Sequence, residues 1–290
     1  MTTPPDTYST PSSPRRHSLG QVLAAYALLV VFSIFALYPL TQIITISLRP
    51  SNQLLSTSLA LIPQGATFES YVKLLFETDY LRWLLNSTLI ALTVTVTGVA
   101  IASTAAYGLS RFRFWGRNAI LSGLLITQMF PATMLLLPLY LMLIQLGLIN
   151  SYLGVIVIYL ATALPFCVWQ LKGYYDTIPT SLEEAALIDG CTPWQTFRKI
   201  VLPLAAPGLA ITALFSFMTA WNEYVVAALV LQETHLFTLP MGLRSFMGNM
   251  NTEWGLYAAG ALIVSVPAVT VFLLVSRFLV SGLTAGGVKE

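Results

Sequence analysis

Three of the twelve acidic residues of this 290-residue chain lie close together, on a segment rich in alanine. The segment reads Glu183-Glu184-Ala185-Ala186-Leu187-Ile188-Asp189-Gly190, and Ile200-Val201-Leu202-Pro203 follows it. A short helix with a flat alanine face and an acid has a shape suited to lying in a groove on another protein. The chemistry predicted here is therefore recognition of a protein partner, with no bond made or broken.

Capping signals divide this segment into two short helices joined by a glycine. Ser181 and Glu184 have the spacing of a capping box at the start of the first helix. Thr192, Pro193 and Gln195 mark the start of the second, with proline in the first helical position. The alternative is an amphipathic helix on the membrane surface, but such helices usually carry Lys or Arg above bulky apolar residues. Docking on a protein is therefore the favoured interpretation.

One acid, Glu223, lies inside a long apolar run, next to Asn222. An ionisable side chain at membrane depth is expensive, at about 2.5–3.5 kcal/mol for Asp on insertion scales, and it usually faces a cavity or a partner. Two interpretations stay open for Glu223. It lines the pathway of a transported solute together with Asn222, or it makes a contact between helices that holds the bundle.

Signatures of enzymatic chemistry are absent from the sequence. No Gly-x-x-x-x-Gly-Lys-[Ser/Thr] loop occurs, so ATP hydrolysis is not expected of this chain. The two histidines, His17 and His235, fall on opposite sides of the predicted membrane, which argues against a metal centre. No Gly-x-Ser-x-Gly elbow is present either. We predict a non-catalytic protein that binds no cofactor or metal of its own and takes its energy from a partner.

The composition is that of a membrane protein. Hydrophobic residues make up 56% and charged residues 9% of the chain, with a mean hydropathy of +0.76. Soluble domains carry about a quarter charged residues. Long apolar runs without period-2 alternation predict helices rather than barrel strands. We expect an all-α polytopic membrane protein with six transmembrane helices, at Gln21–Ser47, Trp83–Leu109, Ala119–Gln145, Tyr152–Leu171, Gly208–Leu231 and Tyr257–Leu279.

Basic residues predict the orientation of these spans. Ten of the fourteen Lys and Arg residues fall on one side, and only Arg49, Lys73, Arg82 and Arg244 fall on the other. The excess of positive charge places both termini and the acidic loop, residues 173–206, in the cytoplasm. The chain then divides into a disordered cytoplasmic tail at 1–19, a first transmembrane helix at 20–47, an extracytoplasmic loop at 48–82, the core transmembrane domain at 83–280 and a cytoplasmic tail at 281–290.

Small residues and prolines predict how the spans are arranged. Gly98, Ala102 and Ala106 recur at helical spacing and allow neighbouring helices to approach closely, so the second span is expected at the centre of the bundle. Pro131 and Pro138 predict a kink or break in the third span. The amphipathic stretch 71–76 lies either on the membrane surface or across the outer end of the bundle.

Several motifs are shared with a known family. Besides the acidic segment they are Asn86-Ser87, Ala106-Tyr107-Gly108-Leu109-Ser110-Arg111, Trp221-Asn222-Glu223-Tyr224, Leu239-Pro240-Met241-Gly242 and the ending Gly282-Leu283-Thr284-Ala285-Gly286-Gly287-Val288-Lys289. Together they resemble the permease subunits of ATP-binding-cassette importers, in the carbohydrate branch, and within it the second membrane subunit of maltose/maltodextrin importers. The acidic segment is similar to the E-A-A loop of that family. The resemblance covers about residues 20 to 290.

The resemblance implies a type I ABC importer transmembrane domain that forms half of a pathway for maltose or maltodextrin. It also implies a second, homologous permease subunit, two ATPase subunits that bind ATP and Mg, and an extracytoplasmic sugar-binding protein. These would assemble in the lipid of a bacterial or archaeal inner membrane, with bound sugar mainly against the other permease subunit and no nucleic acid involved. The same architecture importing trehalose, another oligosaccharide or glycerol-3-phosphate stays open. So does a secondary transporter, from a different class.

The resemblance also implies roles for particular residues. The first helix of the acidic loop would sit in a cleft of the ATPase, where Glu184 pairs with a basic group and Gly190 allows the tight turn. The C-terminal tail, with Gly286 and Gly287, would reach between the ATPase subunits. The residues expected to couple the chain to the ATPase are Glu183, Glu184, Ala185, Ala186, Asp189, Gly190, Leu202 and Pro203.

Overall fold

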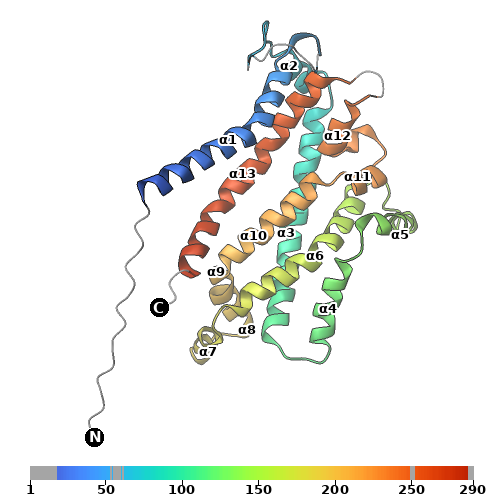
Figure 1. Ribbon diagram of the computed structural model, residues 1–290. Coiled ribbons are helices and arrows are strands. Elements are labelled where there is room, and N and C mark those ends of the chain that lie inside the picture. The colour runs from blue at the N-terminus through green and yellow to red at the C-terminus, as the bar shows by residue number, and fades with distance from the viewer. Residues whose placement is uncertain (1–17, 53, 55–59, 61, 249–251, 287–290) are drawn as a thin grey trace.

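The computed structural model describes residues 18–52, 54, 60, 62–248 and 252–286, and the chain there is almost entirely helical (Figure 1). The long helices are α1 (Leu19–Ser47), α3 (Tyr80–Arg111), α6 (Tyr152–Asp176), α10 (Ala206–Asn222) and α13 (Trp254–Gly286). The shorter ones are α2 (Glu69–Phe76), α4 (Arg117–Thr127), α5 (Ala132–Gln145), α7 (Thr180–Ile188), α8 (Pro193–Thr196), α9 (Leu202–Leu204), α11 (Val225–Val230) and α12 (Leu239–Ser245). A single β-bridge, between Met247 and Thr252, is the only extended pairing among the described residues. The predicted all-α class is confirmed.

Four helices, α1, α3, α6 and α13, are long and apolar enough to cross a membrane. Two bent pairs bring the number in the described part of the chain to six, when each pair counts as one span. The segments 117–129 and 134–145 meet at 105°, so the chain breaks next to Pro131, as its proline predicted. The segments 193–204 and 206–222 meet at 77°. The structure is therefore that of a polytopic membrane protein with up to six spans.

The predicted fifth span, Gly208–Leu231, is wrong as a single helix. α10 ends at Asn222, Glu223 takes an extended conformation, and α11 follows. The reason is that the Glu223 carboxylate accepts hydrogen bonds from the backbone N–H groups of Val226 and Ala227. These groups have no partner at a helix start, so the carboxylate supports a second helix after the break.

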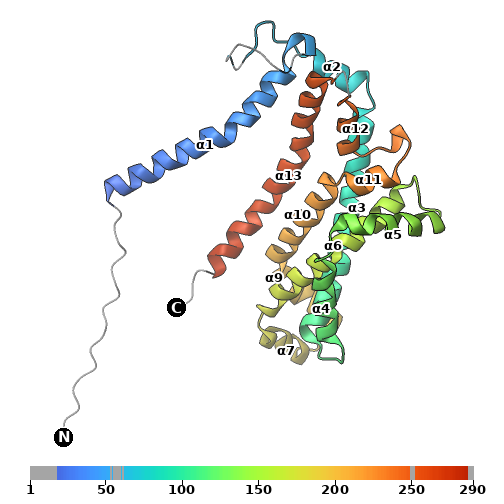
Figure 2. The same cartoon turned by 45° about the vertical axis from the view of Figure 1, so that its right-hand side comes forward.

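The second predicted span, α3, is the central helix of the bundle, as its small residues predicted. It packs along α6 on one side and α10 on another (Figures 1 and 2). Gly98 lies where α3 has close neighbours on both sides, because a Cβ atom there would be 3.3 Å from the Leu160 side chain and 3.4 Å from the Ser216 hydroxyl. Ala102 and Ala106, further along the same face, are fully buried.

The helix α2 lies across the outer ends of α13 and α3. Its Leu74 is fully buried in the main hydrophobic core, and its Tyr71 hydroxyl lies 2.8 Å from the Ser47 hydroxyl at the end of α1. The helix therefore packs on the outer end of the bundle, and with Val72 and Phe76 exposed its contact with the membrane surface stays a prediction.

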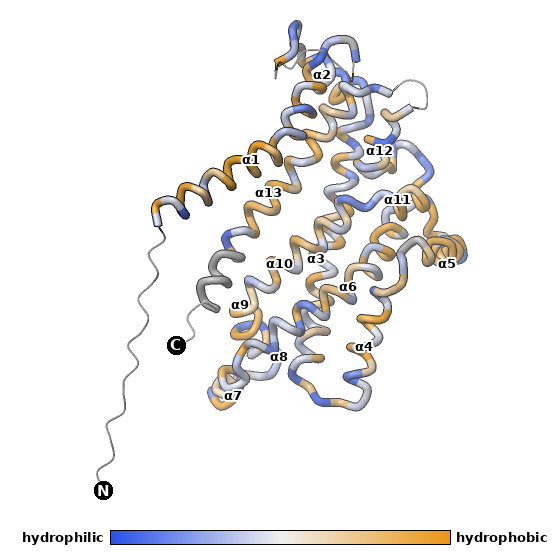
Figure 3. The backbone as a smooth tube through the Cα atoms, viewed as in Figure 1, coloured by the Kyte–Doolittle hydropathy of each residue, from blue (hydrophilic) through white to orange (hydrophobic). Residues whose placement is uncertain are grey.

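The helix α1 is arranged differently from the other spans. Near Ser47 it packs against α13, and from there it leans away from the bundle, most clearly in Figure 2. None of the residues in its most apolar stretch is buried. Figure 3 shows that it is hydrophobic along most of its length, whereas hydrophilic residues gather in the connections at the two ends of the bundle.

The predicted tails fall partly outside the described residues. Residues 1–17 are not described, and α1 already begins at Leu19, with Ser18 as its N-cap. At the other end α13 continues to Gly286, and residues 287–290, with Gly287, lie outside the described part. The predicted contact of this tail with an ATPase stays a prediction.

Candidate docking surface at the inner end of the bundle

The helix α7 carries the acidic segment and leaves the bundle directly after α6. It begins at Thr180, and Pro179 occupies the cap position without any side-chain hydrogen bond. The predicted capping box of Ser181 and Glu184 is therefore wrong. The cap residue is Pro179, two residues before Ser181, so Ser181 lies inside the first turn, where its side chain is no longer at the cap.

The predicted glycine joint after α7 is confirmed. Gly190 has a φ of +87°, in the left-handed region that an L side chain rarely adopts. Its N–H donates to the Leu187 carbonyl at 3.1 Å, and the Cys191 N–H donates to the Ala186 carbonyl at 3.0 Å. This pair of bonds is the Schellman motif, which satisfies the last carbonyl groups of a helix. The chain direction after α7 is therefore fixed by backbone geometry.

The second capping box is also confirmed. The Gln195 N–H donates to the Thr192 hydroxyl at 3.3 Å, and the Thr192 N–H donates to the Gln195 side-chain oxygen at 2.8 Å. Pro193 occupies the start of α8. A π-helical turn, Phe197–Val201, leads through α9 to the bend before α10. The acidic helix is thus joined to a transmembrane helix by a short, regular connection.

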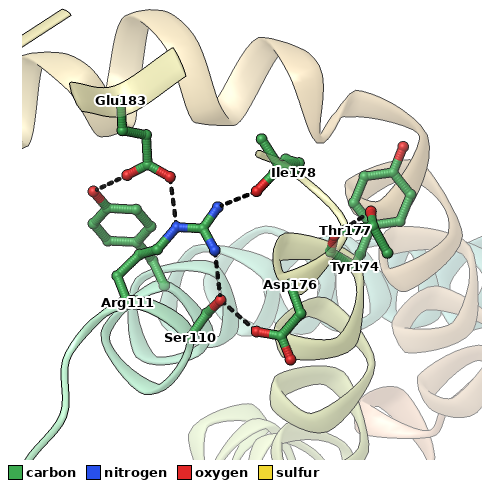
Figure 4. A network of polar contacts seen from close by, with 8 residues as sticks. Ser110, Arg111, Tyr174, Asp176, Thr177, Ile178 and Glu183 are labelled. Carbon is green, nitrogen blue, oxygen red and sulfur yellow. Dashed lines mark hydrogen bonds and ion pairs between the residues drawn. The ribbon is translucent and has the colours of Figure 1, made fainter. Parts of the chain in front are cut away.

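A cluster of polar side chains fastens α7 to the inner end of α3. The Glu183 carboxylate forms an ion pair with the Arg111 guanidinium and accepts a hydrogen bond from the Tyr107 hydroxyl at 2.8 Å. Arg111 also donates to the Ile178 carbonyl at 3.0 Å (Figure 4). The Ser110 hydroxyl accepts from Arg111 and donates to Asp176 at 2.6 Å (Figure 4). We call these five side chains, Tyr107, Ser110, Arg111, Asp176 and Glu183, the inner polar cluster.

The central ion pair of the inner polar cluster is largely shielded from water, whereas Asp176 at the edge of the cluster is 40% exposed. The side chains of Arg111 and Glu183 are only 11% and 10% exposed. Three residues of the cluster come from the motif Ala106–Arg111, and the other two come from the end of α6 and from α7. The motif at the end of α3 therefore holds the base of the acidic helix.

The structure separates the two neighbouring glutamates. Glu183 and Ala186 face the bundle and are buried, because residues three apart share a helix face. Glu184, Ala185 and Asp189 are exposed, and Ile188 beside them is 86% exposed. Of the other predicted coupling residues, Gly190 and Pro203 are exposed and Leu202 is half-buried. The outward face of α7 thus combines acids, alanine and exposed apolar side chains.

The two predicted pathway residues also differ. Glu223 caps α11 and accepts a hydrogen bond from the Tyr159 hydroxyl at 2.8 Å, so its carboxylate is already used within the bundle. Asn222 is exposed, and its amide donates to the Met218 carbonyl of its own helix at 2.9 Å. Within the residues described, no three His, Cys, Asp or Glu side chains come together in a way that would hold a metal.

A second group of contacts joins two more of the sequence motifs, at the outer end of α3. The Asn86 amide donates to the carbonyls of His235 and Phe237, at 3.0 and 2.9 Å. The Ser87 hydroxyl accepts from the Leu239 N–H at 2.6 Å, and the Trp83 indole donates to the Thr234 carbonyl at 2.8 Å. We call Trp83, Asn86 and Ser87, with the segment 234–242 that they hold, the outer contact group.

Gly242 explains why the outer motif ends in glycine. A Cβ atom at Gly242 would lie 1.9 Å from the ring of the buried Trp83. Only a residue without a side chain fits against the indole at that distance. Sequence reasoning identified these motifs but not that they contact one another, because about 150 residues separate them in the chain.

Comparison with known proteins identifies a family match and close relatives of the chain. Residues 95–282 match the family described as binding-protein-dependent transport system inner membrane component. The maltose/maltodextrin transport system permease protein MalG of Yersinia pestis is 39% identical over 287 residues, covering 93% of this chain and 94% of that protein. The MalG protein of Escherichia coli (strain K12) is 38% identical over 288 residues, covering 93% and 96%.

Solved structures share the fold. A chain of a bacterial ABC transporter involved in the import of the acidic polysaccharide alginate has a TM-score of 0.78 at 24% identity, covering 92% of this chain and 99% of that one. A chain of the bacterial alginate ABC transporter in complex with alginate pentasaccharide-bound periplasmic protein has a TM-score of 0.64 at 17% identity, covering 88% and 93%. At these identities the likeness concerns the fold.

Proposed function

Because the chain belongs to the family of binding-protein-dependent transport system inner membrane components, we propose that it is a permease subunit of an ATP-driven maltose or maltodextrin importer. It forms half of the pathway and is not itself an enzyme. ATP and Mg are bound by partner ATPase subunits, and an extracytoplasmic binding protein delivers the sugar to this subunit and a second permease. The likeness to maltose/maltodextrin permeases over nearly the whole chain supports this assignment. The complex would lie in a bacterial or archaeal inner membrane.

The observation that carries the proposal is the way in which α7 is presented. Its outward face, with Glu184, Ala185 and Asp189, is exposed, while its inward face is fastened to α3 by the inner polar cluster. A helix held on one side and open on the other fits a groove of a partner protein. We assign that groove to the ATPase, with Glu184 and Asp189 facing its basic groups.

The inner polar cluster gives this docked helix a direct connection to the bundle. A displacement of α7 by the ATPase would be carried into α3 through the Arg111–Glu183 pair, as well as through the backbone of the loop. Separating the two helices would leave both charges of this largely buried pair without a partner, so we expect α7 and the inner end of α3 to move as one unit. Since α3 packs on α6 and α10, the movement would reach the centre of the bundle.

The first test is uptake of labelled maltose in cells that lack this gene, with and without the restored gene. Trehalose and glycerol-3-phosphate serve as parallel substrates. We expect restored maltose uptake that disappears when ATP is depleted. Restored uptake of another substrate alone would change the cargo and keep the importer. Uptake that survives ATP depletion and follows the proton gradient would overturn the assignment in favour of a secondary transporter.

A further inference from the structure

A groove of about 290 Å³ lies where α10 ends, beside α12 and the first turns of α13. Its polar lining consists of Asn222, Tyr224, Arg244 and Tyr257, which come from α10, from the linker before α11, from α12 and from α13. Its floor is apolar and includes Trp221, which is only 2% exposed. We call this the outer groove.

The break between α10 and α11 indicates that the outer groove does not face lipid. Irregular backbone within a span is tolerated only where it is buried in protein or lines a water-filled cavity. Glu223 satisfies the N–H groups of α11, but the side chains of Asn222 and Tyr224 on either side of it are exposed. An exposed amide beside an arginine would be costly against hydrocarbon.

The polar groups of the outer groove are positioned and still have free hydrogen-bonding capacity. The Arg244 guanidinium donates to the Met247 carbonyl at 2.7 Å, which fixes its orientation and leaves most of its five donors for other partners. The Asn222 amide nitrogen donates to the Met218 carbonyl, and its oxygen has no partner within the described residues. The groove therefore offers an acceptor and several donors close together.

This lining matches the surface of a sugar ring. A pyranose presents apolar C–H faces and a rim of hydroxyl groups, and tyrosine rings offer an apolar face with a polar tip. Amide and guanidinium groups donate to or accept from hydroxyls in fixed planar geometry. No carboxylate lines the groove, because Glu223 turns toward Tyr159 and α11. Its volume is at the lower limit for small-molecule pockets, which suits one ring at a time.

We propose that the outer groove is a sugar-contacting site of this subunit, which holds one glycosyl unit of the oligosaccharide during passage. Tyr224 and Tyr257 provide stacking surfaces, and Asn222 and Arg244 bind hydroxyl groups. This inference rests on the proposed importer function. It locates sugar contacts in this subunit, in addition to those expected in the other permease subunit.

The test uses substituted cysteines in the assembled importer, in a Cys191→Ser background, since the other cysteine, Cys167, is buried. Tyr224→Cys and Tyr257→Cys are reacted with a charged, water-soluble methanethiosulfonate reagent, with and without maltose-loaded binding protein. Tyr38→Cys on α1, where Tyr38 is 60% exposed on an apolar helix, is the matched control. We expect both groove cysteines to react with the reagent, and maltose to lower their reaction rates at least about threefold. The control cysteine should react slowly, at a rate that sugar does not change.

Uptake by a second set of variants gives an independent readout. Loss of one or two hydrogen bonds in Asn222→Leu and Arg244→Leu should lower maximal maltose uptake about three- to tenfold. ATPase stimulation by the loaded binding protein should persist in both. Groove cysteines that do not react, or that react equally with and without sugar while the parent protein imports maltose, would overturn the sugar site. Failure of the parent protein to import maltose would instead refute the proposed function.

Discussion

The two ends of α3 hold their neighbouring segments by different chemistry. At the outer end, neutral groups of Trp83, Asn86 and Ser87 bond to the backbone of the segment 234–239. At the inner end, a guanidinium and a carboxylate, with hydroxyls around them, hold α7 side chain to side chain. Losing one partner of a neutral hydrogen bond has a modest cost in stability. Losing one partner of a buried ion pair leaves the other charge buried and unpaired, which costs more. The charged connection lies at the end where the proposed partner ATPase acts.

The largest effect is expected from breaking the charged connection. Glu183→Ala would leave the Arg111 guanidinium buried without its counter-charge, at a cost of about 3–5 kcal/mol in the free energy of unfolding. Thermal unfolding of the purified importer and its maltose-stimulated ATPase activity would both decrease. The double variant Arg111→Met/Glu183→Leu should recover much of the stability, because it removes both charges. A single variant as stable as the parent would show that the ion pair holds nothing.

The next effect concerns the packing of the outer contact group. Gly242→Ala would place a methyl group 1.9 Å from the Trp83 ring, and overpacking of a core typically costs about 1–3 kcal/mol. We expect the upper end of that range, measured as a lower unfolding temperature of the purified importer. Gly108→Ala is the matched control, because nothing lies within 4 Å of its Cβ position. Equal unfolding temperatures for the two variants would contradict the described contact.

A smaller loss is expected when the neutral connection is cut. Asn86→Ala would remove the donor to the carbonyls of His235 and Phe237, at a cost of about 2 kcal/mol. Hydrogen exchange should speed up in the segment 234–239 and remain unchanged in α7. Thr88→Ala, whose hydroxyl bonds only within its own helix, is the control and should change little. Faster exchange at α7 would mean that the two ends of α3 are not held independently.

The smallest effect on stability, and a clear one on assembly, is expected at Glu184. Its side chain is exposed, so Glu184→Ala should change the free energy of unfolding by less than about 0.5 kcal/mol. A charge-assisted hydrogen bond to the ATPase would account for about 1.5–3 kcal/mol of association. Copurification of the ATPase subunit should therefore weaken tenfold or more. If Glu184→Ala retained the ATPase subunit and Glu183→Ala lost it, the roles assigned to the two glutamates would have to be exchanged.

The features predicted well from the sequence are those that depend on local or repeated patterns. The four unbroken spans, α1, α3, α6 and α13, begin within three residues of their predicted starts, because an apolar run of sufficient length is itself the physical requirement for crossing a membrane. The Thr192 capping box was predicted because both of its partners lie three residues apart. The central position of α3 followed from small residues such as Gly98.

The features that were missed depend on contacts between distant residues. Arg111 and Glu183 are 72 residues apart, so the sequence did not show that Glu183 is buried against Arg111, and Glu183 was grouped with the residues expected to couple the chain to the ATPase. The break after Asn222 was missed because apolar residues continue beyond it. The signal that could have revealed the break is an acid just before a second apolar helical stretch. Its carboxylate can accept from the free backbone N–H groups at a helix start, as Glu223 accepts from the Val226 N–H.

The leaning helix α1 has a consequence for how the protein is made. Since the described bundle buries none of the most apolar stretch of α1, that stretch needs no other part of the bundle in order to be stable in lipid. A helix that is hydrophobic on all sides satisfies its backbone internally and can enter the bilayer as soon as it leaves the ribosome. Membrane insertion of this chain can thus start before any tertiary contact exists, and the rest of the bundle folds afterwards around α3, with α1 anchored to it near Ser47.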